Sequence, residues 1–379
     1  MSKLVSFIVL CTALNSVTAK DSYCYGNITF GNIPFTIQEL IADVLLKSIP
    51  ATFFTDCSNV NIPIANDSIK FYFFNSTSSY VRIDSDNPPQ LDPSKRLIIL
   101  AHGWLCSMND SYFPDLRQAY FKRYGDCNII GVDWSDLSVN VWSIAYCSVP
   151  IVGAKLGDLL CKIASTSGIP VESMHMVGHS MGGQMAGFTG QRVQTQCGSK
   201  IGNITALDPG GISYQVQLDE SKRLDKGDGI AVQVIHTNAG ILGYEGNCGT
   251  TDFYPNCGTI QPGCLDVIQA LKNAALLWPN NPQAILNNSL VNLPLTEVLC
   301  DHFRSIVYFI ESVNSKQFKA IDCKKCTSTI LDSLCLLAQA LNLADYTIMG
   351  EDCPPVNEED AYFLTTNSKS PFAKGDAGA

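Results

Sequence analysis

A serine between glycines is the clearest sign of chemistry in this chain. Residues 174–183 read MHMVGHSMGG, an apolar run that passes through Gly-His-Ser-Met-Gly into a helix-like stretch. A turn this tight admits only glycine at Gly178 and Gly182 and leaves the Ser180 hydroxyl exposed at its tip. The motif alone is weak, since about 0.1 chance matches are expected in a chain this long. It predicts nucleophilic catalysis only if an acid and a base accompany the serine.

A candidate acid follows one apolar run later. Asp208 ends residues 204–208 (ITALD) and precedes Pro-Gly-Gly. A carboxylate at the tip of the next strand could orient an imidazole beside Ser180. The alternative is a simple turn, because Asp before Pro often begins one. Its position one strand after the serine favours the catalytic interpretation.

The base must be one of five histidines. His175 and His179 lie too close to the serine in the chain to reach its hydroxyl, and His102 precedes Gly-Trp in a sequence better suited to an oxyanion loop. The usual order of serine, acid and histidine leaves His236 and His302. Position favours His302, while His236 could be a hydrogen-bonded histidine of the core.

Two backbone N–H groups are candidates for an oxyanion hole. One belongs to Met181, directly after the nucleophile, and the other to Trp104 in AHGW. Gly103 allows the close backbone approach that such a donor needs. The alternative for HGW is a glycine turn followed by an aromatic packing anchor, and both interpretations can hold together.

These residues need a sheet to position them. Apolar runs predict strands, and helical spacing predicts helices between them. The predicted strands are residues 70–74, 97–101, 129–133, 174–177, 204–208 and 230–236, and the predicted helices are 112–124, 139–164 and 183–193. The alternation predicts an α/β fold with a mostly parallel central sheet covered by helices on both faces. Residues 20–68 and 310–379 show no regular pattern. We expect the first segment to cover the N-terminal side and the second to close the C-terminal side of a single domain, 20–379.

Composition narrows the functional classes. The 379 residues are 46% hydrophobic and carry a net charge of −10, without a basic cluster. Nucleic acid is therefore an unsuitable partner, and contact with a lipid surface would be mainly apolar. Residues 1–19 have the basic, apolar and small-residue regions of a signal peptide, which predicts a secreted, extracellular protein. No other run is long and apolar enough for a transmembrane segment.

The cysteines and sequons fit the secretory pathway. Of 16 cysteines one lies in the signal peptide, so an odd number remains and one thiol should stay free or pair with another chain. Cys323-Lys-Lys-Cys326 is better explained by structural disulfides than by a metal or redox site. Glycan acceptor sequons begin at Asn27, Asn66, Asn75, Asn109, Asn203 and Asn287.

Residues 265–299 have the features of a lid. Cys264 and Cys300 bracket them, and the first half has amphipathic helical spacing before Pro-Asn-Asn-Pro. A disulfide between the two cysteines would tether the segment beside His302. Such a helix could close an apolar cleft in water and open at a lipid surface. The alternative is a permanently docked surface helix.

The motifs AHGW, GVDWS, VGHSMGG, ALDPG, VIHTNAG and CDHFRS occur in order over residues 70–379, and together they resemble the secreted pancreatic-lipase-type lipases. That family includes triacylglycerol lipases and phospholipases A1. The resemblance implies an α/β-hydrolase fold that hydrolyses glycerolipid esters at a lipid–water interface without a cofactor. It assigns Ser180 as nucleophile, Asp208 as acid and His302 as base, with oxyanion donors at Trp104 and Met181. It also implies that His236 is structural.

Several features depart from the family pattern. Only 77 residues follow His302, too few for the C-terminal β-sandwich domain of the pancreatic members. The loop between residues 236 and 252 is short, as in phospholipases A1, whereas the lid is long, as in neutral-lipid lipases. A phospholipase A1 acting on sn-1 esters therefore remains the alternative substrate assignment. Cys248 and Cys257 flank the short loop and could staple it.

Two further implications concern metal and activity. The family's structural calcium site would fall on Glu220, Arg223, Asp225 and Asp228, but the match is partial and no metal is predicted. Some insect relatives are non-catalytic yolk or lipid-binding proteins that lack the nucleophile. All three triad residues are present here, which argues against that class.

Overall fold

The computed structural model describes residues 56–65, 67–76, 79–109, 112–266, 297, 299–322, 346–355 and 360–378. The predicted signal peptide, most of the predicted N-terminal cover and nearly all of the predicted lid lie outside these residues. The boundaries of the predicted domain 20–379 are therefore not tested.

The described residues form an eleven-stranded sheet in the order β10-β9-β11-β8-β7-β6-β5-β3-β4-β1-β2. The strands are β1 (Lys70–Phe74), β2 (Tyr80–Ile83), β3 (Leu97–Ala101), β4 (Asn128–Asp133), β5 (His175–His179), β6 (Ile201–Leu207), β7 (Gly229–Ile235), β8 (Thr251–Pro255), β9 (Lys319–Asp322), β10 (Tyr346–Ile348) and β11 (Asp360–Leu364). From β11 to β4 each strand is parallel to its neighbour. Antiparallel strands extend both edges.

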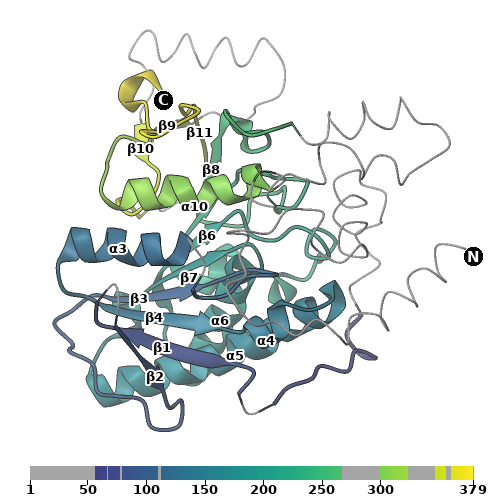
Figure 1. Ribbon diagram of the computed structural model, residues 1–379, viewed down its shortest axis with the longest axis vertical. Coiled ribbons are helices and arrows are strands. Elements are labelled where there is room, and N and C mark those ends of the chain that lie inside the picture. The colour runs from purple at the N-terminus through teal and green to yellow at the C-terminus, as the bar shows by residue number, and fades with distance from the viewer. Residues whose placement is uncertain are drawn as a thin grey trace, which may run out of the picture.

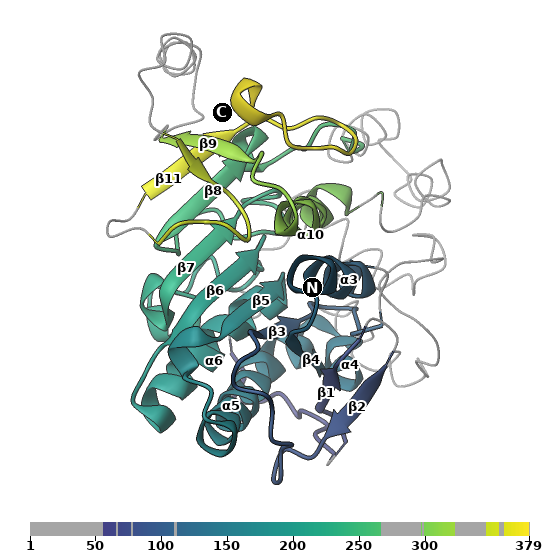
Figure 2. The same cartoon turned by 90° about the vertical axis from the view of Figure 1, so that its left-hand side faces the viewer.

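Helices cover both faces of this sheet (Figures 1 and 2). On one face lie α5 (Trp142–Ser167) and α6 (Met181–Cys197), and on the other α3 (Tyr112–Tyr124) packs beside α10 (Cys300–Val313). The shorter helices are α4 (Ser135–Ser138), η4 (Val171–Ser173), η5 (Glu220–Lys222), η6 (Lys226–Asp228), η7 (Asn256–Gly258) and η9 (Gly375–Ala377). Two covered faces explain why the central strands are apolar throughout, as in β3 (LIILA), which is fully buried.

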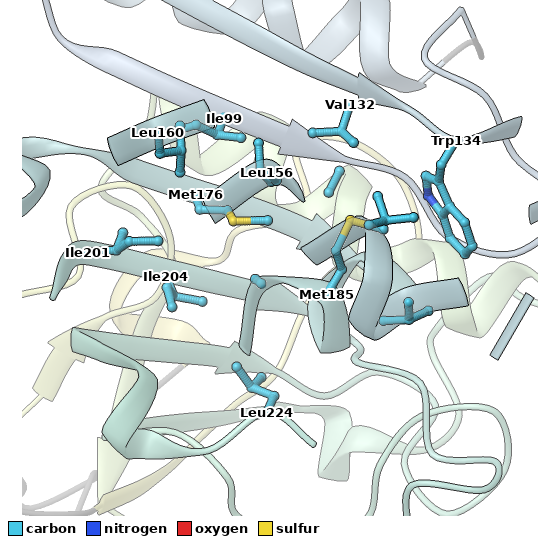
Figure 3. Packing of buried hydrophobic residues seen from close by; sticks show 14 of the residues in the cluster. Ile99, Val132, Trp134, Leu156, Leu160, Met176, Met185, Ile201, Ile204 and Leu224 are labelled. Carbon is cyan, nitrogen blue, oxygen red and sulfur yellow. The ribbon is translucent and has the colours of Figure 1, made fainter. Parts of the chain in front are cut away.

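The core on the α5–α6 face joins strands to helices (Figure 3). Strand residues such as Ile99 and Met176 meet Leu156 of α5 and Met185 of α6, and all four are fully buried. Each such side chain contributes roughly 1.5–3 kcal/mol by leaving water. This layer fixes β5 against α6, and the turn between them carries Ser180.

Helix α5 is long and apolar enough to cross a membrane by length and composition, but 61% of the relevant window is buried inside the molecule. Its buried residues include Val149, Val152 and Leu160, which belong to the core. A core helix of a globular domain accounts for this pattern.

The predicted fold class is confirmed, with differences in detail. Residues 70–74, 97–101 and 112–124 form the expected elements, and the other predicted strands and helices begin or end one to four residues away. The prediction of an irregular segment 310–379 is wrong, because β9, β10 and β11 extend the sheet there. Helix α10 and strand β8 were also not predicted. His302 therefore lies in the first turn of a helix rather than on a loop.

The disulfides partly match expectation. Cys264 and Cys300 are bonded, as predicted, with Cα atoms 5.5 Å apart. Two further bonds are Cys57–Cys147 and Cys161–Cys197. The suggested Cys248–Cys257 staple is wrong: Cys248 is a buried free thiol, and Cys257 belongs to another disulfide. Within the described residues Cys127 and Cys353 are also free, so more than the single predicted thiol is unpaired.

Candidate active site

The turn between β5 and α6 holds Ser180 in a conformation that few non-glycine residues adopt, with φ 56° and ψ −122°. Both flanking glycines are required by space, as predicted. A Cβ at Gly178 would lie 2.0 Å from the Gly182 carbonyl oxygen, and one at Gly182 would lie 2.3 Å from that of Ala101. Such a strained residue costs about 1–3 kcal/mol and persists only where its surroundings enforce it.

Backbone hydrogen bonds tie this turn to the neighbouring strand end. The Ser180 N–H donates to the Leu207 carbonyl at 3.0 Å, and the Gly210 N–H donates to the Ser180 carbonyl at 3.0 Å. Asp208 lies between these two partners, with φ 44°. The nucleophile turn and the acid turn therefore form one hydrogen-bonded unit at the carboxyl ends of β5 and β6.

The structure brings Asp208 and His302 together. His302 Nδ1 lies 2.6 Å from Asp208 Oδ2, and both side chains are buried. The other carboxylate oxygen, Oδ1, accepts the N–H groups of Thr237 at 2.8 Å and Asn238 at 3.0 Å. Since a carboxylate is an acceptor, Nδ1 carries the hydrogen, and Nε2 is left as the proton acceptor.

His302 is also fixed through its backbone. Its carbonyl oxygen accepts the Ser305 hydroxyl at 3.0 Å and the His179 Nε2–H at 3.2 Å. The rings of His179 and His302 lie 4.5 Å apart between centroids. Because His179 adjoins Ser180 in the chain, this contact places the imidazole of His302 beside the nucleophile turn.

His179 itself is not a base for the serine. Burial, together with the nearby charge of His302, lowers the pKa of His179 well below its ordinary value. Its Nδ1 is buried without a partner among the described residues. A neutral ring that donates through Nε2 supports His302 without competing for the proton.

His236, the other candidate base, belongs to a separate pair. Its Nε2 lies 2.8 Å from Asp252 Oδ1 and its Nδ1 lies 3.0 Å from the Tyr244 carbonyl oxygen. The ring is fully buried and stacks on Tyr254 at 4.4 Å. Both nitrogens are engaged, so this histidine has no atom left for the serine.

The oxyanion donors predicted from sequence lie on two segments that meet at Ser180. A Cβ on Gly103 would lie 2.7 Å from Ser180 Cβ and 3.3 Å from Oγ, so the loop after β3 lies directly against the nucleophile. Trp104 is held there by its indole N–H, which donates to the Asn140 carbonyl at 2.8 Å. Met181 is the first residue of α6, where N–H groups have no partner within the helix.

His102 stabilises the same loop. Its Nε2 accepts the Trp134 N–H at 3.1 Å, its carbonyl accepts the Trp134 indole N–H at 2.9 Å, and the two rings stack at 5.5 Å. The ring thus anchors the backbone between β3 and Gly103, in agreement with the prediction that His102 is not the base.

The residues proposed for calcium do not fit a metal as arranged here. Asp225 accepts the Gly227 N–H, and Asp228 accepts the Asp225 N–H, a reciprocal capping box around η6. The Arg223 carbonyl accepts the Gln191 amide at 3.3 Å, and its guanidinium lies 3.7 Å from Asp225. No cluster of three or more metal-ligating side chains occurs in the described part of the chain.

Three supporting residues were not predicted from the sequence. Thr237 binds Asp208 through its N–H, Asp301 precedes His302, and Gln261 contacts both Thr237 and Asp301. Thr237 and Asp301 lie within two recognised motifs, VIHTNAG and CDHFRS, and Gln261 lies three residues before Cys264. Their contacts are long-range, which a single sequence does not reveal.

Comparison with known proteins identifies relatives. Residues 75–372 match the family model described as Lipase. The chain is 32% identical over 294 residues to lipase member H of Danio rerio, covering 75% of this chain and 58% of the relative. It is 28% identical over 321 residues to pancreatic triacylglycerol lipase of Cavia porcellus, covering 80% and 64%. Inactive pancreatic lipase-related protein 1 of Homo sapiens is 28% identical over 305 residues, covering 75% and 58%.

The chain therefore spans about 58–64% of the length of these three relatives. Among solved structures, the esterase PE8 aligns with a TM-score of 0.30 and 19% identity, covering 39% of this chain and 73% of that one. A likeness this low supports no conclusion about function. The family match extends over most of the chain and includes Ser180, Asp208 and His302; this chain belongs to the lipase family.

Proposed function

We propose that this chain is a secreted serine lipase that hydrolyses carboxylic esters of glycerolipids, with Ser180 as nucleophile, His302 as base and Asp208 as acid. The observation that carries the proposal is the 2.6 Å contact between His302 Nδ1 and Asp208 Oδ2, buried beside the strained turn of Ser180. Family membership alone is insufficient, since one relative is named inactive.

The first half of the reaction forms an acyl-enzyme. Ser180 Oγ attacks the ester carbonyl carbon while His302 Nε2 takes the hydroxyl proton, and Asp208 stabilises the imidazolium that results. The carbonyl oxygen becomes negative and is bound by the N–H groups of Trp104 and Met181. The C–O bond to the alcohol then breaks, and His302 returns its proton to the leaving alcohol.

The second half releases the fatty acid. Water attacks the acyl carbon while His302 Nε2 accepts a proton from it, and the same N–H groups bind the negative oxygen again. The bond to Ser180 Oγ breaks, and the proton passes from His302 to the serine. Both halves use the same three side chains, and the proposal invokes no cofactor.

Exposed apolar side chains on two segments support a lipid–water interface as the place of action. Ile260 is 45% exposed and Leu265 is 41% exposed, on the segment that leads from β8 to the Cys264–Cys300 bond. Leu218 is 95% exposed, on a loop anchored by the bond between Ser213 and Trp142. With a net charge of −10, apolar contact is the more favourable way to meet a lipid surface.

Secretion is supported by the disulfides, because such bonds persist in oxidising compartments. The sequon asparagines among the described residues, Asn75, Asn109 and Asn203, are exposed and accessible to a glycan. Secretion and glycosylation are testable by expression in a secretory host and digestion with an endoglycosidase.

The central test replaces the nucleophile. Ser180→Ala should lower ester hydrolysis by roughly 10⁴-fold or more, because no other hydroxyl occupies the turn. The matched control is Ser199→Ala, which removes the serine just beyond the other end of α6, where it bonds Glu172. Hydrolysis that survives in Ser180→Ala would rule out the serine mechanism.

The same preparation defines the substrate. Purified protein is given triacylglycerol or diacyl phosphatidylcholine, and released fatty acid is assigned to its glycerol position. Release mainly from triacylglycerol supports a neutral-lipid lipase. Release mainly from the sn-1 position of phosphatidylcholine supports the phospholipase A1 alternative. Binding of both lipids without hydrolysis would indicate a lipid-binding protein instead.

A further inference from the structure

We propose that Gln261 is a positioning residue that fixes Asp208 and His302 relative to one another. The proposal rests on the function proposed above for that pair. It comes from the contacts of one buried residue, whose side-chain amide reaches the neighbour of Asp208 and whose backbone N–H reaches the neighbour of His302. Gln261 is 1% exposed and lies between β8 and the Cys264–Cys300 bond.

All hydrogen-bonding groups of the Gln261 side chain are used. Its Nε2 donates to the carbonyl oxygens of Thr237 and Pro255, each at 3.0 Å. Its Oε1 accepts the Asn256 amide at 2.8 Å and the Tyr308 hydroxyl at 3.1 Å. A glutamine amide offers two donors and one acceptor oxygen with two lone pairs, so the side chain is saturated. Such saturation holds it in a single orientation.

One set of these bonds leads to Asp208. Thr237 donates its N–H to Asp208 Oδ1 at 2.8 Å, and its own carbonyl is held by Gln261. Gln261 thereby fixes the peptide segment that binds the acid from the side opposite His302. Loss of this bond would free Thr237 to move and, with it, one of the two N–H groups that orient the carboxylate.

A second set leads to His302. The Gln261 N–H donates to Asp301 Oδ1 at 2.6 Å, and Asp301 is the residue before His302. The Tyr308 hydroxyl, on the same helix α10, reaches the Gln261 Oε1. Helix α10 is therefore held by one residue at two points, Asp301 in its first turn and Tyr308 in its third, and the first turn carries His302.

The Cys264–Cys300 disulfide closes the arrangement. The Gln261 carbonyl accepts the Cys264 N–H at 3.1 Å, Cys264 is bonded to Cys300, and Cys300 adjoins Asp301. Gln261, Cys264, Cys300 and Asp301 thus form a ring of covalent and hydrogen bonds beside the base. Because reacting groups must meet within a narrow distance, a displacement of about 1 Å can cost 10²-fold in rate.

The test removes the amide while preserving its volume. Gln261→Met keeps the side-chain size, loses all four side-chain bonds and retains the backbone N–H bond to Asp301. The kcat should fall about 30- to 100-fold while KM changes less than about 3-fold. The matched control is Gln233→Met. Gln233 is also buried, as the fifth residue of β7; its amide donates to Thr205 and Gly350 and accepts from Gly350, and none of these bonds involves Asp208 or His302. It should lower Tm by a similar amount and leave kcat within about 2-fold.

A second variant guards against a general folding defect. Gln261→Glu keeps the oxygen that accepts from Asn256 and Tyr308, and as a neutral carboxyl it has one O–H donor for the two carbonyl oxygens of Thr237 and Pro255 instead of two N–H donors. The path to Asp208 is weakened while the path to α10 is kept. Its kcat should fall, by no more than in Gln261→Met. A fall that tracks only Tm across all three variants would overturn the proposal.

A spectroscopic readout separates this proposal from the proposed function. The Nδ1–H of His302 in its short bond to Asp208 should give a downfield proton NMR signal, assigned by its loss in His302→Gln. Gln261→Met should shift or broaden that signal, and Gln233→Met should leave it unchanged. An unchanged signal in Gln261→Met would overturn the positioning role, even in an active enzyme. A changed signal in a protein that hydrolyses no ester would sustain the positioning role and refute the proposed function.

Discussion

Two buried histidines in the described part of the chain contact buried aspartates at nearly equal short distances, His302 with Asp208 at 2.6 Å and His236 with Asp252 at 2.8 Å. They differ at the second ring nitrogen. His236 Nδ1 contacts the Tyr244 carbonyl, whereas His302 Nε2 has no partner within the described residues. The contact between an imidazole and a carboxylate therefore does not by itself mark a catalytic pair; the proposed catalytic pair differs from the other in the second ring nitrogen of His302, which is unbonded among the described residues.

The largest expected difference between the pairs is in rate. Asp208→Asn should lower kcat by about 10⁴-fold, because an amide that donates to His302 Nδ1 favours the wrong tautomer. Asp252→Asn should leave kcat of the folded protein within about 3-fold, since its partner does not contact Ser180. Ester hydrolysis by matched amounts of folded protein measures both. Equal losses of activity in the two variants would contradict the inference that the His302 pair is catalytic and the His236 pair structural.

The next difference is in stability. His236→Phe keeps a ring against Tyr254 but removes both hydrogen bonds and leaves the carboxylate of Asp252 buried with only the Cys248 and Gly249 N–H groups as donors. The free energy of unfolding should fall by about 3 kcal/mol. Denaturant titration checks this value. A stable protein that has lost its activity would instead implicate His236 in the chemistry.

The smallest expected effect is a pH dependence of stability that comes from Asp301, the residue before His302. Burial raises the pKa of Asp301 to about 7, against the hydrogen bond from Gln261, and the charge of Asp208 adds to the increase. The folded protein therefore binds one more proton than the unfolded chain between about pH 4 and pH 7, and wild-type stability falls as pH rises through that window.

Asp301→Asn keeps an oxygen for the Gln261 N–H and removes this titration. Its free energy of unfolding should approach that of wild type near pH 4 and exceed it at pH 8 by on the order of 2 kcal/mol, after allowance for partial exposure. Unfolding titrations at the two pH values measure the difference. A constant difference at both would show that Asp301 titrates normally in the folded protein.

The comparison also shows what the sequence could predict. The Ser180 turn was predictable because Gly178, Gly182 and the flanking apolar run specify it locally. The choice between His236 and His302 was not, since both follow Ser180 and Asp208 in the chain order of a triad and their acid partners lie 16 and 94 residues away in the chain. Position in the chain favoured His302 only slightly, and the family resemblance assigned it as the base. Its place in a helix and the contacts of Gln261 were both missed.

The fold was predictable where strands are apolar and buried on both faces, as in β3. It was not predictable for β9, β10 and β11, which have three to five residues each and are only partly buried. Strands this short at a sheet edge form by pairing with a neighbour rather than by their own periodicity. The predicted disulfide between Cys248 and Cys257 rested on their proximity in the sequence. It was wrong because Cys248 belongs to the buried core and Cys257 forms a different disulfide.

The Cys264–Cys300 bond separates the position of His302 from the length of the chain between the two cysteines. The two cysteines, with a sequence separation of 36, are held with their Cα atoms 5.5 Å apart, and Cys300 lies two residues before His302. Chain length between such fixed ends can change at a small entropic cost, about 0.6 kcal/mol for each doubling. The number of residues between the two cysteines can therefore change while the bonded ends keep their place beside His302.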